Sequence, residues 1–250
     1  MSITKINNAI LKEWAERSME RGEGEISNDG LHNKGHFLYS EDGYWSREPS
    51  GDEEWMWKAN RTRLLFLTKD LNDNEAWDIR YETGRKNGTA YPQVTALFYK
   101  NMMRITTGLH IWAKYGKIED FDGIETYSQR TFFDAAATAR INCKKQPGGG
   151  SISNERLKTY IDAYADLLAR QIVNLDANVI VCCGGSSMIK DFVAEHCYTD
   201  LVKKNDWVYV SPSTGKIVID SYHLSYHFIS EKDFYNQMMT ALKNSGVMIK

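Results

Sequence analysis

The feature that most constrains the fold is a run of four large apolar residues, Leu64 to Leu67, that stops abruptly at a polar cluster. A short, unbroken apolar run is typical of a strand buried on both faces, as in a parallel sheet covered by helices. In open α/β sheets, ligands bind just beyond the carboxyl ends of the strands. The run therefore predicts a ligand site, with an ordinary polar loop as the alternative. The polar residues that would lie there are Thr68, Lys69, Asp70, Asn72 and Asp73.

Strand-like and helix-like segments alternate along the rest of the chain. Helical periodicity is seen in residues 3–21, 93–115, 154–175, 186–196 and 231–243. Further strands are indicated in residues 177–185, 208–210 and 216–220, and at the end of a segment that runs from 132 to 145. This order predicts an α/β protein with three layers, α/β/α, around a mainly parallel sheet. We expect residues 1–60 to form a helix and an irregular extension packed on a single domain, residues 61–250.

Composition narrows the class of protein. The formal net charge is −2 and the sequence pI about 6.3, which argues against a generally basic nucleic-acid-binding protein but allows a local basic rim. No apolar run approaches the roughly 20 residues that span a bilayer, and the first residues lack the apolar stretch of a signal peptide. We therefore expect a cytoplasmic protein, with a monomer favoured. The four cysteines form no Cys-x-x-Cys pair, so neither disulfides nor a cysteine-bound metal is expected.

Polar residues follow three of the predicted strands. If these strands are parallel neighbours, their polar ends converge on one edge of the sheet. A carboxylate there can position water, an Asn amide can read a carbonyl and N–H edge, and a His can donate to a developing anion. The set suits hydrolytic cleavage at a base or sugar. A metal pair of His223 and His227 lacks further ligands, so no metal is expected. The three strand ends are Asp70 with Asn72, Asn142 with Lys144 and Lys145, and His223 with Ser225.

The order of these motifs resembles the uracil-DNA glycosylase superfamily. In the family 1 enzymes, a hydrophobic strand ends in Gly-Gln-Asp-Pro-Tyr, whose Asp activates water. Residues 68–72, Thr-Lys-Asp-Leu-Asn, take that place, with Asp70 in register with this Asp. A later family motif, His-Pro-Ser-Pro, carries a His that stabilises negative charge on the base. His223 and Ser225 match it, although both prolines are missing.

The middle of the chain is more similar to the family 4 and 5 enzymes. Their strand ends in an Asn followed by Lys-Cys-Arg-Pro-Pro, then a long helix and an apolar strand ending in Leu-Gly. Residues 142–147, Asn-Cys-Lys-Lys-Gln-Pro, follow this plan, and Asn142 would be the residue that reads uracil. Gly88-Thr89-Ala90-Tyr91 resembles a Gly-x-x-Phe segment, so Tyr91 would stack on the flipped base. The iron–sulfur cysteines of these families are absent, and no cluster or other cofactor is expected.

The resemblance implies a base glycosylase that acts on DNA. Asp70 and His223 would be catalytic, and Asn142, Tyr91, Asn72, Ser225 and Lys69 would bind the substrate. Arg140, Lys144 and Lys145 would form a rim that faces nucleic-acid phosphates, for which a solvated basic face is the alternative. Two other functions remain open. One is a non-catalytic protein of the same fold that binds nucleic acid or a nucleotide, and the other is a hydrolase of a small nucleoside or metabolite.

Overall fold

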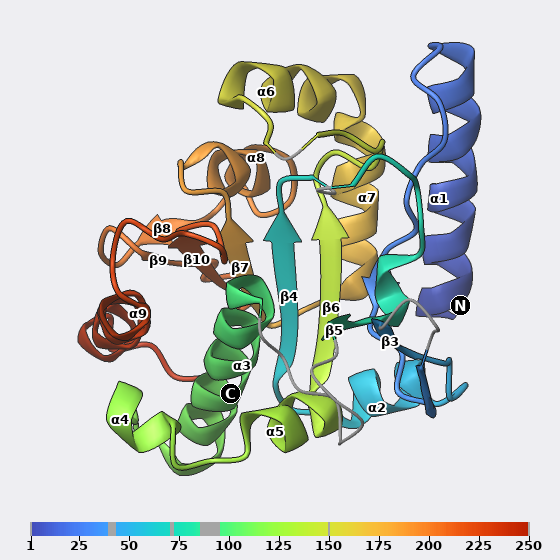
Figure 1. The fold of residues 1–250 in the computed structure, drawn as a ribbon. Helices are drawn as coiled ribbons and strands as arrows, with labels where there is room; N and C mark the ends of the chain where they lie inside the picture. Colours follow the sequence, from blue (N-terminus) through green and yellow to red (C-terminus); the bar gives the residue numbers. More distant parts are fainter. Residues whose placement is uncertain (1, 40–43, 71–72, 86–95, 150, 250) are drawn as a thin grey trace.

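The computed structural model describes residues 2–39, 44–70, 73–85, 96–149 and 151–249. Its central sheet has seven strands, which lie in the order β1-β6-β4-β7-β10-β9-β8 (Figure 1). The four inner strands β6, β4, β7 and β10 are parallel, and the edge strands pair in antiparallel fashion. In chain order the strands are β1 (Gly30–Leu31), β4 (Arg63–Thr68), β6 (Ala137–Asn142), β7 (Val179–Cys183), β8 (Val202–Lys203), β9 (Val208–Val210) and β10 (Ile217–Ser221).

Helices cover both faces of this sheet (Figure 1). One face packs against α1 (Ile3–Glu20), α2 (Glu53–Ala59), α6 (Asn154–Ala163), α7 (Ala165–Leu175) and α8 (Met188–His196). The other packs against α3 (Leu97–Tyr115), α4 (Phe121–Ile124), α5 (Gln129–Ala135) and α9 (Glu231–Asn244). The predicted α/β class and mainly parallel sheet are thus confirmed, and the two helical faces are consistent with three layers. Within the described residues, the helices lack the combination of length and apolar composition that crossing a membrane requires.

The predicted strand at Leu64–Leu67 is confirmed as β4, which lies between β6 and β7. Leu65 and Leu67 belong to the core beneath α1 and α7, whereas Leu64 and Phe66 belong to the core beneath α3 and α9. All four side chains are completely buried. Each stabilises the fold by roughly 1.5–3 kcal/mol. Because alternate residues face opposite layers, a central strand needs an unbroken apolar run.

The N-terminal region contains more regular structure than the irregular extension that the sequence predicts. β1 pairs with β6, so this region supplies an edge strand of the central sheet. A second sheet with the order β2-β3-β5 is formed by β2 (Phe37–Tyr39), β3 (Tyr44–Arg47) and β5 (Glu82–Arg85), which follows the short 3-10 helix η1 (Ile79–Tyr81). Strands of two to four residues are too short to show a periodicity in the sequence.

The helix predicted for residues 154–175 is divided into α6 and α7. Ser153 caps α6 by accepting a hydrogen bond from the backbone N–H of Arg156, and Tyr164 interrupts the helix with φ −123° and ψ 21°. The Tyr164 ring stacks on Trp14 of α1 with a centroid distance of 4.8 Å. Its hydroxyl donates a 2.5 Å hydrogen bond to the Glu23 carboxylate. The break in the helix therefore coincides with the contacts of Tyr164 to Trp14 and Glu23, which the helical periodicity of the sequence does not reveal.

Candidate functional site

The carboxyl ends of the parallel strands form the sheet edge at which the site residues lie. From β4 the chain continues toward β6, whereas from β7 it continues toward β10 on the other side. Connections that leave neighbouring strands in opposite directions open a crevice between the strand ends, and α/β proteins bind ligands there. At this position Thr68, the last residue of β4, pairs with Asn142 of β6 and Cys183 of β7. Residues 68–70 therefore lie at the strand ends where such a crevice is expected.

Asn142 ends β6 and is completely buried. Its backbone N–H donates to a carboxylate oxygen of Asp29 at 2.9 Å, and its side-chain Oδ1 accepts a hydrogen bond from the Thr68 hydroxyl. Its side-chain nitrogen Nδ2 has no hydrogen-bond partner within the described parts of the chain. A buried polar group without a partner costs about 1–3 kcal/mol. A ligand that accepts a hydrogen bond from Nδ2 would recover this free energy.

Arg140 lies two residues before Asn142 on the same face of β6. Its Nε donates to the Thr68 hydroxyl oxygen at 3.3 Å, and its guanidinium carbon is 4.6 Å from the centre of the Phe98 ring. A further hydrogen bond of 3.4 Å joins Nη1 to the Tyr99 hydroxyl. Only 6% of Arg140 is exposed, so its predicted place on a phosphate-facing rim is wrong. It lies beneath the site, where it donates a hydrogen bond to the Thr68 hydroxyl oxygen.

Asp70 follows β4 and is half-buried at the carboxyl end of this strand. Burial raises the pKa of its carboxyl group, and the positive charges of Lys144, Lys69, Arg140 and Arg156 oppose that rise, with Lys144 first among them. Among the described residues, none donates a hydrogen bond to its carboxylate. Such a carboxylate is available to orient a water molecule or to face a positive charge that develops during a reaction.

Lys144 joins the loops that follow β4 and β6. Its side chain is 2% exposed, and its Nζ donates to the carbonyl oxygens of Gln146 at 2.5 Å and Pro147 at 3.0 Å. Its backbone N–H donates to the carbonyl of Lys69 at 2.9 Å, which fixes the two loops side by side. Lys144 is therefore an internal cation near Asp70, and its predicted place on a solvent-facing rim is also wrong.

Replacing Lys144 with methionine is expected to raise the pKa of Asp70 further. The ammonium group of Lys144 favours the charged carboxylate, so its removal leaves burial less opposed. The pKa can be measured by carbon NMR of the side-chain carboxyl group during a pH titration. Lys158→Met is the matched control, because Lys158 lies on the exposed face of α6 and pairs with Asp162 at 2.7 Å. An Asp70 pKa that falls or stays constant in Lys144→Met would contradict this electrostatic coupling.

His223 follows β10 and is held as a neutral hydrogen-bond donor. Burial, together with the charges of Lys69 and Arg140, lowers the pKa of His223 to about 4. The backbone N–H of Ser225 donates to His223 Nδ1 at 3.2 Å. Because Nδ1 accepts this bond, the ring hydrogen of neutral His223 resides on Nε2. His223 and Ser225, which the sequence predicts at the same strand end, are thus in contact through the backbone N–H of Ser225.

Phe98 is a residue of this region that the sequence analysis did not name. It lies in the first turn of α3, where its ring centre is 5.9 Å from that of His223. Arg140 packs against the same ring. Phe98 therefore brings β6 and the segment after β10 into contact. In the sequence it falls within the helical periodicity of residues 93–115, a pattern that gives no signal of a place near the site.

Lys145 lies outside the site and is completely buried. Its Nζ is 2.5 Å from the Asp29 carboxylate and 4.5 Å from the Trp14 ring centre. Burial lowers the pKa of Lys145, and the Asp29 carboxylate opposes that shift. The predicted place of Lys145 on a nucleic-acid rim is therefore wrong, because the residue points away from solvent into the core beneath α1.

The remaining predicted binding residues lie near the carboxyl ends of the strands or outside the described residues. Lys69 follows β4, and its Nζ donates to the Asn154 side-chain oxygen at 3.3 Å. This contact brings Lys69 to the start of α6, where Arg156 is exposed. Asn72 and Tyr91 lie outside the described residues. Among the described residues, Lys69 and Arg156 are thus basic groups near these strand ends, and the sequence analysis named Lys69 but not Arg156.

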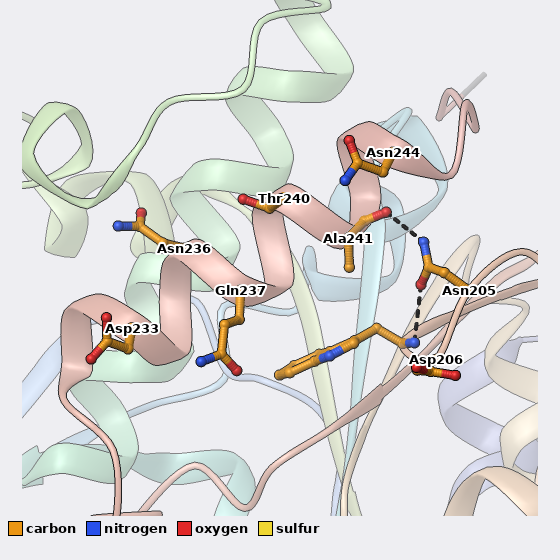
Figure 2. Close-up of a pocket in the computed structure, with 9 residues that line it drawn as sticks. Asn205, Asp206, Asp233, Asn236, Gln237, Thr240, Ala241 and Asn244 are labelled. Carbon is orange, nitrogen blue, oxygen red and sulfur yellow. Dashed lines mark hydrogen bonds between the residues drawn. The ribbon is translucent and has the colours of Figure 1, made fainter.

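Two surface cavities share no lining residue with this site. One, of about 460 Å³, lies along α9 and is lined by amide and carboxylate side chains that include Asn236, Gln237 and Asn244 (Figure 2). Asn205 spans its side by donating to the backbone carbonyl of Ala241 at 2.8 Å (Figure 2). The other, of about 240 Å³, lies between α1 and η1. In the described ranges, His, Cys, Asp and Glu side chains form no cluster of three that could hold a metal ion.

No protein-family model matches the chain, and no curated protein matches it significantly.

Proposed function

We propose that this protein is a DNA-base glycosylase-like hydrolase of the uracil-DNA glycosylase type, which cleaves the N-glycosidic bond of a flipped, uracil-like base. One observation carries the proposal. A half-buried carboxylate, a neutral imidazole and a buried amide with an unpartnered nitrogen lie at the same sheet edge, contributed by Asp70, His223 and Asn142. The charges of Lys69 and Arg140 act on both Asp70 and His223, and Arg140 is linked through Thr68 to Asn142.

Asp70 would act on the sugar side of the bond. Cleavage of an N-glycosidic bond leaves positive charge on the sugar, and water must add to its anomeric carbon. A carboxylate stabilises that charge and orients the water, from which it can accept a proton. Lys144, Lys69, Arg140 and Arg156 oppose the rise that burial causes in the Asp70 pKa, and so favour the ionised carboxylate that this role requires.

His223 would act on the departing base. The base leaves with negative charge, which a donor at the carbonyl oxygen can stabilise. Neutral His223 can donate from Nε2, because Nδ1 accepts the Ser225 N–H. With a pKa of about 4, His223 remains neutral above that pH, so it should produce no activity transition near pH 6.5. An acid limb of the pH profile is expected from Asp70 instead, whose pKa lies above its ordinary value.

Asn142 would bind the base and Phe98 would supply an aromatic surface beside it. A base can reach such a buried amide only after it leaves the stack. The Asn142 Nδ2 group can donate to a base carbonyl, and the Phe98 ring lies near His223, which would contact the same base. Tyr91 keeps its proposed stacking role from the family resemblance. Lys69 and the exposed Arg156 would contact the flanking phosphates.

A second candidate function is hydrolysis of a small nucleoside. It is favoured by the burial of Arg140, Lys144 and Lys145, the three cations expected to face a nucleic-acid backbone. A free nucleoside has no phosphates, so it needs no basic rim. The two substrates are distinguished by salt, because DNA binding weakens steeply as salt concentration rises.

The first test is a base-release assay on labelled oligonucleotides, single- and double-stranded, containing uracil, hypoxanthine, xanthine or a thymine mismatch. Free uridine and inosine are assayed in parallel at low and high salt. We expect alkali-labile sites with the natural protein and none with Asp70→Ala. Release from nucleosides alone, without a salt effect, would support the second candidate. Binding of DNA without any release would instead indicate a non-catalytic protein, and equal release by Asp70→Ala would exclude the proposed mechanism.

A further inference from the structure

The hydrogen bonds around Asn142 form a directed chain. Arg140 can only donate, so the Thr68 hydroxyl oxygen accepts from Arg140 Nε at 3.3 Å. The Thr68 hydroxyl then has two acceptors within reach, Asn142 Oδ1 and the Ile141 carbonyl at 3.3 Å, and its contact with Oδ1 is the shorter of the two. With Oδ1 turned toward Thr68, Nδ2 is the atom left without a partner. All three residues are at least nine-tenths buried, so water does not readily substitute for a missing partner.

We propose that Thr68 and Arg140 are positioning residues that determine which base the site accepts. They act through Asn142 by fixing its amide with the nitrogen toward the ligand. The ligand atom that meets Nδ2 must then be a hydrogen-bond acceptor. The second lone pair of Oδ1 can accept from an adjacent N–H of the ligand. This arrangement selects a base with a carbonyl next to an N–H, and it rejects a base with an amino group next to an unprotonated ring nitrogen.

This inference rests on the proposed function and adds a selectivity to it. Uracil and hypoxanthine present a carbonyl beside an N–H on their pairing edge, whereas cytosine and adenine present the opposite order. A rotation of the Asn142 amide by 180° would exchange its nitrogen and oxygen and reverse the preference. The Thr68 hydroxyl opposes that rotation, because it makes its shorter hydrogen bond to Oδ1 and its oxygen already accepts from Arg140. A site built to hydrogen-bond a particular group strongly rejects analogues that leave its buried polar groups unpaired.

The test is the replacement of Thr68 by valine, which keeps the branched shape and removes the hydroxyl. We expect the ratio of kcat/KM for uracil over cytosine substrates to fall about tenfold to a hundredfold, the value of one or two buried hydrogen bonds. Thr68→Ser retains the hydroxyl and should restore the ratio. Thr138→Val is the matched control, because Thr138 is 2% exposed on the same strand as Asn142 and its hydroxyl is 2.9 Å from His32 Nδ1. That control should leave the ratio unchanged.

A second readout separates this inference from the proposed hydrolysis. Binding of free uracil and free cytosine is measured by calorimetry on the natural protein and the same variants. Preferential uracil binding that Thr68→Val alone abolishes would support the inference even if no bond is cleaved. Base release with a ratio unchanged in Thr68→Val would overturn it while the hydrolase function stands. A preference for cytosine, or neither binding nor release, would also overturn it.

Discussion

Replacing Asp70 with asparagine is expected to lower the rate of base release by about 10²- to 10⁴-fold. Asparagine has nearly the same shape, so the surrounding packing is kept, but it can neither accept a proton from water nor balance positive charge on the sugar. Substrate binding should persist, because the change removes a negative charge beside Lys69 and Lys144, which act on Asp70. Single-turnover rates and equilibrium binding of a uracil-containing oligonucleotide, measured on the same preparation, give the two quantities separately.

Asp73→Asn is the matched control for this experiment. Asp73 is an exposed carboxylate three residues further along, and its Oδ1 accepts only the neighbouring Asn74 backbone N–H at 2.7 Å among the described residues. The same chemical change there should leave the rate within about twofold of the natural protein, since a surface substitution seldom exceeds ±0.5 kcal/mol. Equal losses in Asp70→Asn and Asp73→Asn would show that the charge of the loop, rather than a carboxylate at residue 70, supports the reaction.

Replacing Asp29 with alanine is expected to destabilise the protein by about 3–5 kcal/mol. Asp29 is completely buried and accepts hydrogen bonds from Lys145 Nζ at 2.5 Å, the Asn142 N–H at 2.9 Å and Gln171 Nε2 at 2.7 Å. Its removal leaves a buried ammonium group without a counter-charge and a buried N–H without an acceptor. Urea unfolding followed by circular dichroism measures the change in the free energy of unfolding.

Two further variants test this explanation. Asp166→Ala removes the partner of an exposed ion pair, in which Arg17 Nη1 lies 2.6 Å from Asp166, and should cost no more than about 1 kcal/mol. Adding Lys145→Met to Asp29→Ala should recover part of the loss, because it removes the unpaired buried charge. A double variant less stable by the sum of both single losses would mean that the Asp29–Lys145 charge pair is not the source of stability.

The sequence was sufficient to identify the inner strands of the central sheet and the polar residues that follow β4, but not the edge strands β1 and β8. The apolar run at Leu64–Leu67 identifies β4, since only a strand covered on both faces needs four consecutive large apolar side chains. Because Asp70 and the other polar residues come directly after this strand, they are expected at the carboxyl edge of the sheet. Strand order is not encoded locally. Whether Asn142 lies next to Thr68 depends on how β6 pairs, which the structure supplies.

The burial of the basic residues could not be predicted in the same way. Arg140 is buried because Thr68, Phe98 and Tyr99 surround it, and these come from β4 and α3. Lys145 is buried because Asp29, 116 positions earlier in the chain, compensates its charge. Local sequence shows only cations near a strand end, a pattern typical of solvated faces. A buried cation requires a distant partner, and no periodicity links the two positions.

The Asp29 contacts also determine when the site can form during folding. Asp29 binds Asn142 across 113 positions of the chain and Gln171 across 142 positions. Contacts between residues so distant carry a large loop-closure entropy and form late. During synthesis, Asp70 and Asn142 emerge well before Gln171, which completes the set of partners around Asp29. Nascent chains that end before α7 therefore contain the proposed carboxylate and amide without the Gln171 contact to Asp29, so the surroundings of Asn142 stay incomplete until α7 has been synthesised.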